Sequence, residues 1–198
     1  FHFDMHIYNT ELLSTVFQIP VKVYTHSTIK GYFNDKAQRL RVEGYFPRLR
    51  YENKFIESGM FLCENPGDQF HTRLRFSNRK SSGTVNIALE AQAQSNSIQT
   101  TLNWGNSSTV TYSGKLAAVA HFIREQKEAN ESKRKLPPLK TVIDVQPTNV
   151  ILNDTLWDIH SSQVVLDSGK VYVNDFYFSH KDRHLRINGI VSPHPEDT

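Results

Sequence analysis

The chain has 198 residues, of which 38% are hydrophobic and 22% are charged, and its formal net charge is +3. This length suffices for one sizeable domain or a long run of β-structure, and no stretch holds the roughly 18–20 apolar residues of a membrane-spanning helix. The single cysteine, Cys63, excludes an intrachain disulfide and a cluster of cysteine thiolates around a metal ion.

The first half of the chain alternates apolar and polar residues with the period of two that is typical of β-strands. The alternation is already present at residues 1–7, so we expect the chain to be a single fragment, 1–198, of a larger β-rich protein. It returns at 40–46 and at 70–76, each time after a predicted turn.

Three long strands are predicted between residues 85 and 122. Apolar residues occupy most second positions over 85–93, 98–104 and 110–122, and mostly polar residues stand between them. A turn at 105–108 separates the last two segments. This pattern predicts a meander of antiparallel strands.

The segment 124–138 breaks the alternation, because it is charged, lacks β-branched residues and ends in two prolines. We predict a charged, mobile insertion here. A short helix over 116–131 is an open alternative, since Ala, Glu, Lys and Gln favour helices. One charged loop or short helix is therefore expected near 116–138.

The C-terminal part returns to predicted strands. Apolar residues stand at odd positions up to Val173 and at even positions from Phe176, on either side of Asn174 and Asp175. One extra residue in a strand reverses the faces of the residues that follow it, so this change predicts a β-bulge. The predicted fold class of the chain is all-β.

No constellation of residues typical of catalysis is present in the sequence. There is no Gly-x-Ser-x-Gly motif, no motif around Cys63 and no glycine-rich phosphate loop. His180 and His184 have the spacing of helical metal ligands, but they flank a predicted hairpin turn. Arginines beside aromatic residues at 48–51 and 73–76 are interpreted as charges that protect a sheet. We predict no enzyme activity, metal, cofactor or nucleic-acid partner.

The apolar strand faces have two interpretations. One is the filled core of a β-sandwich, in a surface module that binds carbohydrate or protein. The other is a curved antiparallel sheet around an open apolar trough, which would bind apolar molecules such as lipid chains. Scarce helical cover and small inward residues, among them Ala91, Ala118 and Ala120, favour the trough.

The run IDVQPTNVILNDTLWDIH at 143–160 is the most distinctive part of the chain. It is followed by NDFYF at 174–178, by LRINGIVS at 185–192 and by Pro-Glu-Asp at 195–197. Over residues 84–198 these strand motifs resemble the TamB family, the translocation and assembly module, in the form found in Bacteroidetes. The motifs are structural and supply no active site.

The resemblance implies a periplasmic segment of a long cell-envelope protein, anchored to the inner membrane by a segment outside this chain. It implies a curled sheet, the β-taco, that acts without catalysis as a hydrophobic groove. The implied roles are outer-membrane protein assembly and translocation, or phospholipid transport between the two membranes.

The partners that the resemblance implies are a BamA/TamA-type barrel protein of the outer membrane, and either phospholipid acyl chains or nascent β-barrel strands. The groove would be lined by apolar side chains of the alternating strands. These are Val85, Ile87, Leu89, Ile98, Leu102, Trp104, Val110, Tyr112, Leu116, Val171, Val173, Phe176 and Phe178.

Overall fold

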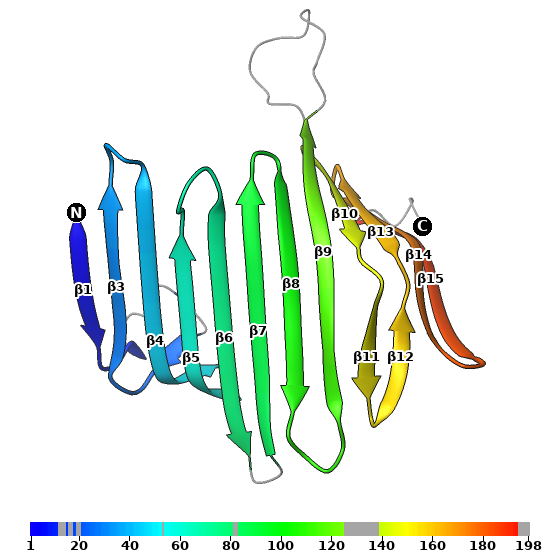
Figure 1. Ribbon diagram of the computed structural model, residues 1–198, viewed down its shortest axis with the longest axis horizontal. Helices are drawn as coiled ribbons and strands as arrows, with labels where there is room; N and C mark the ends of the chain where they lie inside the picture. Colours follow the sequence, from blue (N-terminus) through cyan, green and yellow to red (C-terminus); the bar gives the residue numbers. More distant parts are fainter. Residues whose placement is uncertain are drawn as a thin grey trace, which may run out of the picture.

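The computed structural model describes residues 1–11, 15, 18, 21–52, 54–80, 83–124 and 139–193 of the chain. In this part the chain forms 15 strands of one sheet (Figure 1). The strands are β1 (His2–Ile7), β2 (Val21–Val23), β3 (Ser27–Asn34), β4 (Arg39–Tyr51), β5 (Lys54–Glu64), β6 (Phe70–Lys80), β7 (Gly83–Gln94), β8 (Ser97–Asn106), β9 (Tyr112–Arg124), β10 (Leu139–Val145), β11 (Thr148–Leu152), β12 (Thr155–Ile159), β13 (Ser162–Asp167), β14 (Lys170–His180) and β15 (Arg183–Val191).

Every pairing in the sheet is antiparallel, and from β3 to β9 each strand pairs with the next strand along the chain. The alternation of apolar and polar residues favours this arrangement, because it gives each strand one apolar face that neighbouring strands continue when they pair in register. The predicted fold class, an all-β curved antiparallel sheet, is confirmed.

Beyond β9 the strands pair in an order that differs from their order in the chain, but the arrangement is simple. β10 and β11 both pair with β9, at different levels, and β12 and β13 both pair with β14. β10 also pairs with β13, and β11 with β12. Each of these two sets is therefore one long strand with an interruption, and the sheet is a meander throughout this region (Figure 1).

The predicted β-bulge in the C-terminal strands is confirmed. The register between β14 and β15 shifts between Val173 and Phe176, and Asp175 has a left-handed φ of 54°. Pro147, which has no N–H to donate, lies in the interruption between β10 and β11. There the Gln146 N–H donates to the Ala117 carbonyl at 2.8 Å.

The helix considered over 116–131 is wrong for its described part. Residues 116–124 continue β9, which pairs with β8 on one side and with β10 on the other. Two flanking strands supply backbone partners along this segment, and this outweighs a helix propensity of a few tenths of a kcal/mol per residue. The predicted insertion at 124–138 lies outside the described residues except for Arg124, which is the last residue of β9.

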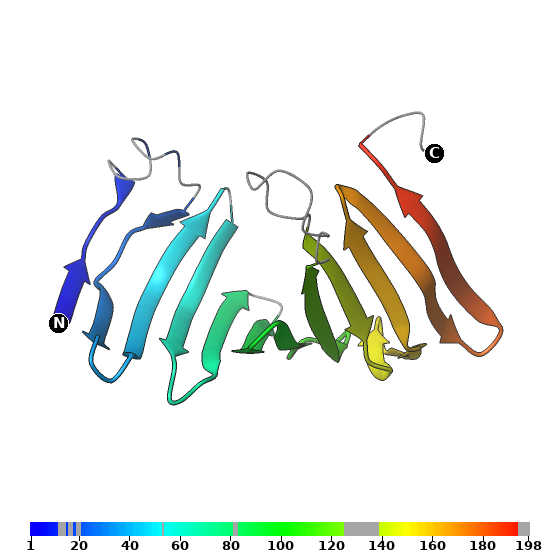
Figure 2. The same ribbon diagram turned by 90° about the horizontal axis from the view of Figure 1, so that it is seen from above.

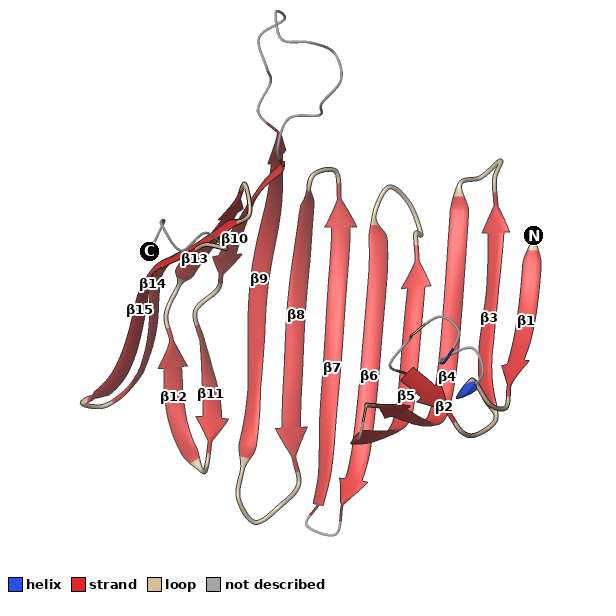
Figure 3. Ribbon diagram, turned by 180° about the vertical axis from the view of Figure 1, so that it is seen from behind, coloured by secondary structure: helices blue, strands red, loops and turns tan. Residues whose placement is uncertain are grey.

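The ends of β4 and β5 leave the main sheet and fold over it. Beyond Phe46, β4 pairs with the short strand β2 instead of β3, and the pairing of β5 with β6 stops at Glu57. We call β2 together with 47–52 and 54–58 the flap. Figure 3 shows the flap in front of the sheet.

The sheet bends so that its two flanks turn to the same side of the central strands β7–β9 (Figure 2). Only three hydrophobic side chains of the described residues are buried, namely Val23, Leu49 and Val150. A β-sandwich would bury the alternate residues of every central strand against a second sheet. The sandwich interpretation is therefore wrong for the described part of the chain.

Candidate functional site

The register places the apolar residues of neighbouring strands directly opposite one another. Leu74 on β6 lies opposite Leu89 on β7, which lies opposite Leu102 on β8, and Leu102 lies opposite Leu116 on β9. Side chains that lie directly opposite share a face of the sheet. We call the face that carries these four leucines the inner face.

The inner face is the one that the two flanks turn toward. Leu49 of the flap lies against it, with its Cδ2 atom 3.6 Å from the position that a Cβ on Gly59 would occupy. The flap itself lies on the side toward which the flanks bend (Figure 3). The apolar residues therefore line the hollow of the curved sheet.

Twelve of the thirteen residues predicted to line a groove share the inner face. On β7, β8 and β9 these are Val85, Ile87, Leu89, Ile98, Leu102, Trp104, Tyr112 and Leu116, and on β14 they are Val171, Val173, Phe176 and Phe178. Val110 lies in the connection between β8 and β9 instead. Its carbonyl accepts hydrogen bonds from the Asn106 Nδ2 and the Ser108 Oγ, so its backbone is part of a turn.

Charged side chains are almost absent from the inner face. The register places side chains from β6 to β14 on this face. Among those that the structure describes, a single one is charged, namely Arg124 at the end of β9. The remaining positions are apolar or carry uncharged groups such as Thr72 and Thr100. The sequence itself is 22% charged, so the charges are concentrated elsewhere.

These apolar side chains are open to solvent. Val85 and Ile87 keep 36% and 39% of their surface, and in the described part of the chain no second layer covers them. The whole chain exposes 14360 Å². A compact monomer of 22.8 kDa exposes about 9,600 Å². A surplus is expected of a single-layered sheet, because both of its faces meet solvent.

Four glycines on the inner face lie opposite aromatic residues of the neighbouring strand. The pairs are Gly31 with Phe3, Gly44 with Phe61, Gly59 with Phe46 and Gly114 with Trp104. In three of them a ring lies over the glycine, because a Cβ there would meet ring atoms at 2.6 Å in Gly31, 2.2 Å in Gly44 and 2.5 Å in Gly114. These rings therefore lie across the neighbouring glycines, so they project little into the hollow of the sheet.

A second aromatic group lies where β12 meets β14. Trp157 and Phe178 stack with ring centroids 4.7 Å apart and planes inclined by 6°. The ring of His180 lies 5.5 Å from Trp157, and its Nδ1 is 2.6 Å from the Leu156 carbonyl oxygen. This stack extends the apolar lining to the C-terminal flank.

The opposite, outer face carries the charges. Lys30 lies 3.2 Å from Asp4, and the Arg41 guanidinium contacts Glu64 at 2.6 Å and Glu43 at 3.0 Å. The hydrogen bond to Glu43 raises the pKa of Arg41 above its ordinary value, and the nearby charges of Glu64 and Glu43 add to this, against the effect of burial. These pairs are exposed, so they contribute solubility and little stability.

The described residues contain no group of three or more His, Cys, Asp or Glu side chains that could hold a metal ion. Ser179 and His160 lie on the outer face with Oγ and Nε2 3.2 Å apart. The ring of His160 also packs edge-on against Tyr177.

Two parts of this surface could not be found by periodicity. The flap depends on a bend at Pro47, and the pairing of aromatic residues with glycines depends on the register between strands.

None of the helices in the described residues has the length and hydrophobicity that a membrane span requires. A comparison of the chain with models of protein families, with curated proteins and with solved structures found no match to any of them.

Proposed function

We propose that the chain is a non-enzymatic segment of a TamB-like cell-envelope protein whose inner face holds phospholipid acyl chains. The observation that supports this proposal most directly is the nearly uncharged and uncovered inner face. An acyl chain gains about 0.8 kcal/mol for each methylene that it removes from water. A lining with few hydrogen-bonding groups binds such chains without fixing them at one position, as transport between two membranes requires.

A second proposed role is the binding of a client β-strand at the edge of the sheet, as in the assembly of an outer-membrane barrel with a BamA/TamA-type partner. Every residue of the edge strand β15 is exposed, and among the strands that the structure describes it pairs with β14 alone. The backbone groups on its free side are oriented to pair with an added strand. This role uses the edge of the sheet, whereas lipid binding uses its inner face.

The lipid proposal predicts that Leu102→Glu abolishes phospholipid binding and leaves the fold intact. Leu102 lies at the centre of the inner face but is not fully buried, so its replacement exposes a carboxylate to acyl chains as well as to water. Native mass spectrometry of the purified chain measures bound phospholipid, and circular dichroism measures the fold.

The matched control is Asn103→Glu. Asn103 is the next residue of β8, on the outer face opposite Lys115. This variant is expected to bind phospholipid like the unmodified chain. Equal phospholipid binding by Leu102→Glu and Asn103→Glu would contradict the proposal, and so would an unmodified chain that carries no lipid after incubation with vesicles.

A further inference from the structure

The flap joins the main sheet at one level of β4 and β5, where the backbone of both strands is irregular. In β4 this level is that of Pro47, which donates no backbone hydrogen bond, and in β5 it is that of Ser58, with a left-handed φ of 50°. The two residues face each other between the pairs Phe46–Gly59 and Arg48–Glu57. On its other side β5 has a register shift against β6 between Glu57 and Met60.

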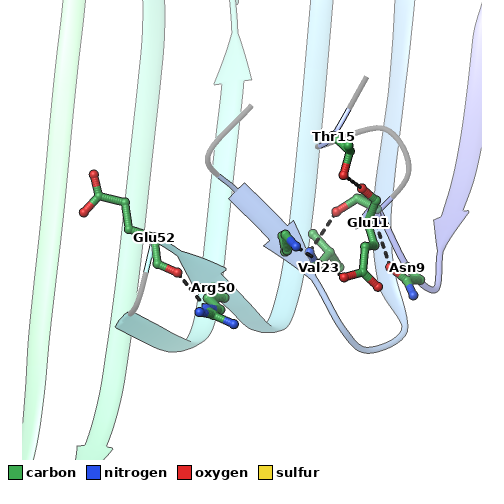
Figure 4. Close-up of polar contacts among 8 residues, drawn as sticks. Asn9, Glu11, Thr15, Val23, Arg50 and Glu52 are labelled. Atoms are coloured by element: carbon green, nitrogen blue, oxygen red, sulfur yellow. Dashed lines mark hydrogen bonds and ion pairs between the residues drawn. The ribbon is translucent and has the colours of Figure 1, made fainter. Parts of the chain in front are cut away.

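The flap is held together better than it is held to the sheet. Within it β2 pairs with the end of β4, which pairs with the start of β5. Val23 lies opposite Leu49, and the Arg50 Nε donates to the Glu52 carbonyl at 2.6 Å (Figure 4). These pairings let the flap move as one body. Its Val23 N–H also donates to the Thr10 Oγ1 at 2.9 Å, which ties the flap to the segment that follows β1.

Apart from the pairing of Glu57 with Ser77 of β6 at the hinge, few described contacts tie the flap to the main sheet. Leu49 is 8% exposed and lies over Gly59, which has no side chain of its own, beside the ring of Phe76. The Asn78 Nδ2 donates to the Phe55 carbonyl at 2.8 Å. The other large side chains near the tip stay exposed, Tyr51 at 44% and Phe55 at 41%.

We propose that the flap is a hinged cover that swings away from the inner face at Pro47 and Ser58 and admits an apolar chain beneath it. Leu49 then leaves the space over Gly59, and an acyl chain takes its place beside Phe76. This inference rests on the proposed function for its ligand. The opening itself is a property of the flap, and it can be measured with no lipid present.

Opening is tested by the reactivity of a buried thiol, in a background with Cys63→Ser so that no other cysteine reacts. Leu49→Cys places the thiol under the flap. Val150→Cys is the matched control, since Val150 is 3% exposed and lies in β11 between β9 and β12. If the flap opens locally, a maleimide labels the thiol at 49 at least about tenfold faster than the thiol at 150. Equal rates would overturn the proposal.

Admission of lipid is tested by closing the flap with a disulfide. Leu49→Cys combined with Gly59→Cys joins two positions in contact across the interface, again with Cys63→Ser. The probe is pyrene-labelled phosphatidylcholine in vesicles, and its transfer to the protein is followed by fluorescence. We expect oxidation to slow the transfer about tenfold and a reductant to restore it, which makes each protein its own control.

The two arms separate this inference from the proposed function. If the oxidised and reduced proteins take up the lipid at the same rate, the hinged cover is wrong and the lipid groove stands. If neither form nor the unmodified chain takes up lipid, the proposed function is wrong and the role of the flap in admission is wrong with it.

Discussion

Glycine opposite an aromatic residue is the recurring pair of the inner face, and it decides how the lining is shaped. Trp104 lies across Gly114 because a glycine leaves the neighbouring backbone bare, and Val150 of β11 packs against the same glycine. Such pairs compensate the loss of β-propensity that a strand glycine brings. They also keep large side chains out of the hollow.

The pair at Gly114 predicts that Gly114→Ala destabilises the fold. A Cβ there would lie 2.5 Å from a ring carbon of Trp104 and 2.7 Å from Val150, so one of the two must move. We expect a loss of about 1–3 kcal/mol in the free energy of unfolding, measured by urea denaturation. Gly105→Ala is the control, because its nearest atom would be 3.7 Å away, and an equal loss there would contradict the explanation.

At this scale the sequence predicted the faces but not the contacts. The alternation of apolar residues was enough to place Leu89 and Leu102 on one surface, because the period of two is fixed by the backbone. The partner of Gly114 depends on the register between β8 and β9, which is set by the turn between them. Val110 was misplaced for the same reason, since this turn holds it outside the strand.

Among the elements, β14 shows how one irregular residue reorients a strand. Asp175 is in the left-handed region, and its carboxylate pairs with Arg186 on β15. The bulge lets β14 keep its apolar side chains on the inner face from Val171 to Phe178 while the strand changes direction.

This bulge predicts different results for two substitutions of Asp175. Asp175→Val is expected to cost about 1–3 kcal/mol, because a β-branched residue is strained at a positive φ. Asp175→Asn keeps a residue that tolerates this conformation and loses an ion pair with 61% and 63% exposed side chains, which contributes at most about 1 kcal/mol. Urea denaturation of the two variants distinguishes backbone strain from loss of the ion pair. A larger loss of unfolding free energy in Asp175→Asn than in Asp175→Val would contradict this explanation.

The elements that the sequence did not reveal are those made by partners distant in the chain. The alternation at 70–76 and 85–93 was read correctly because each strand signals its own period. In the flap, β2 replaces β3 as the partner of β4, and the residue types at 48–51 do not predict this change of partner. The bulge was found because a change of phase is visible within a single strand.

At the scale of the whole molecule, the sheet is a single layer that leaves many large hydrophobic side chains exposed. We predict that the folded chain binds anilinonaphthalene sulfonate strongly, because the dye partitions onto exposed apolar surface. Fluorescence should rise with the dye while the circular dichroism stays that of a β-sheet, and phospholipid should displace the dye. If the fluorescence of the dye does not rise with the folded chain, the inner face is covered in solution and the prediction is wrong.

The meander order of the strands also has a consequence for how the sheet forms. From β3 to β9 each strand finds its partner in the segment synthesised just before it, and the two interrupted strands after β9 continue the same order. Such a chain has little loop entropy to lose before each pairing, so contact order is low for an all-β protein. The sheet can therefore grow one hairpin at a time from the N-terminal side, and each completed hairpin leaves the template for the next.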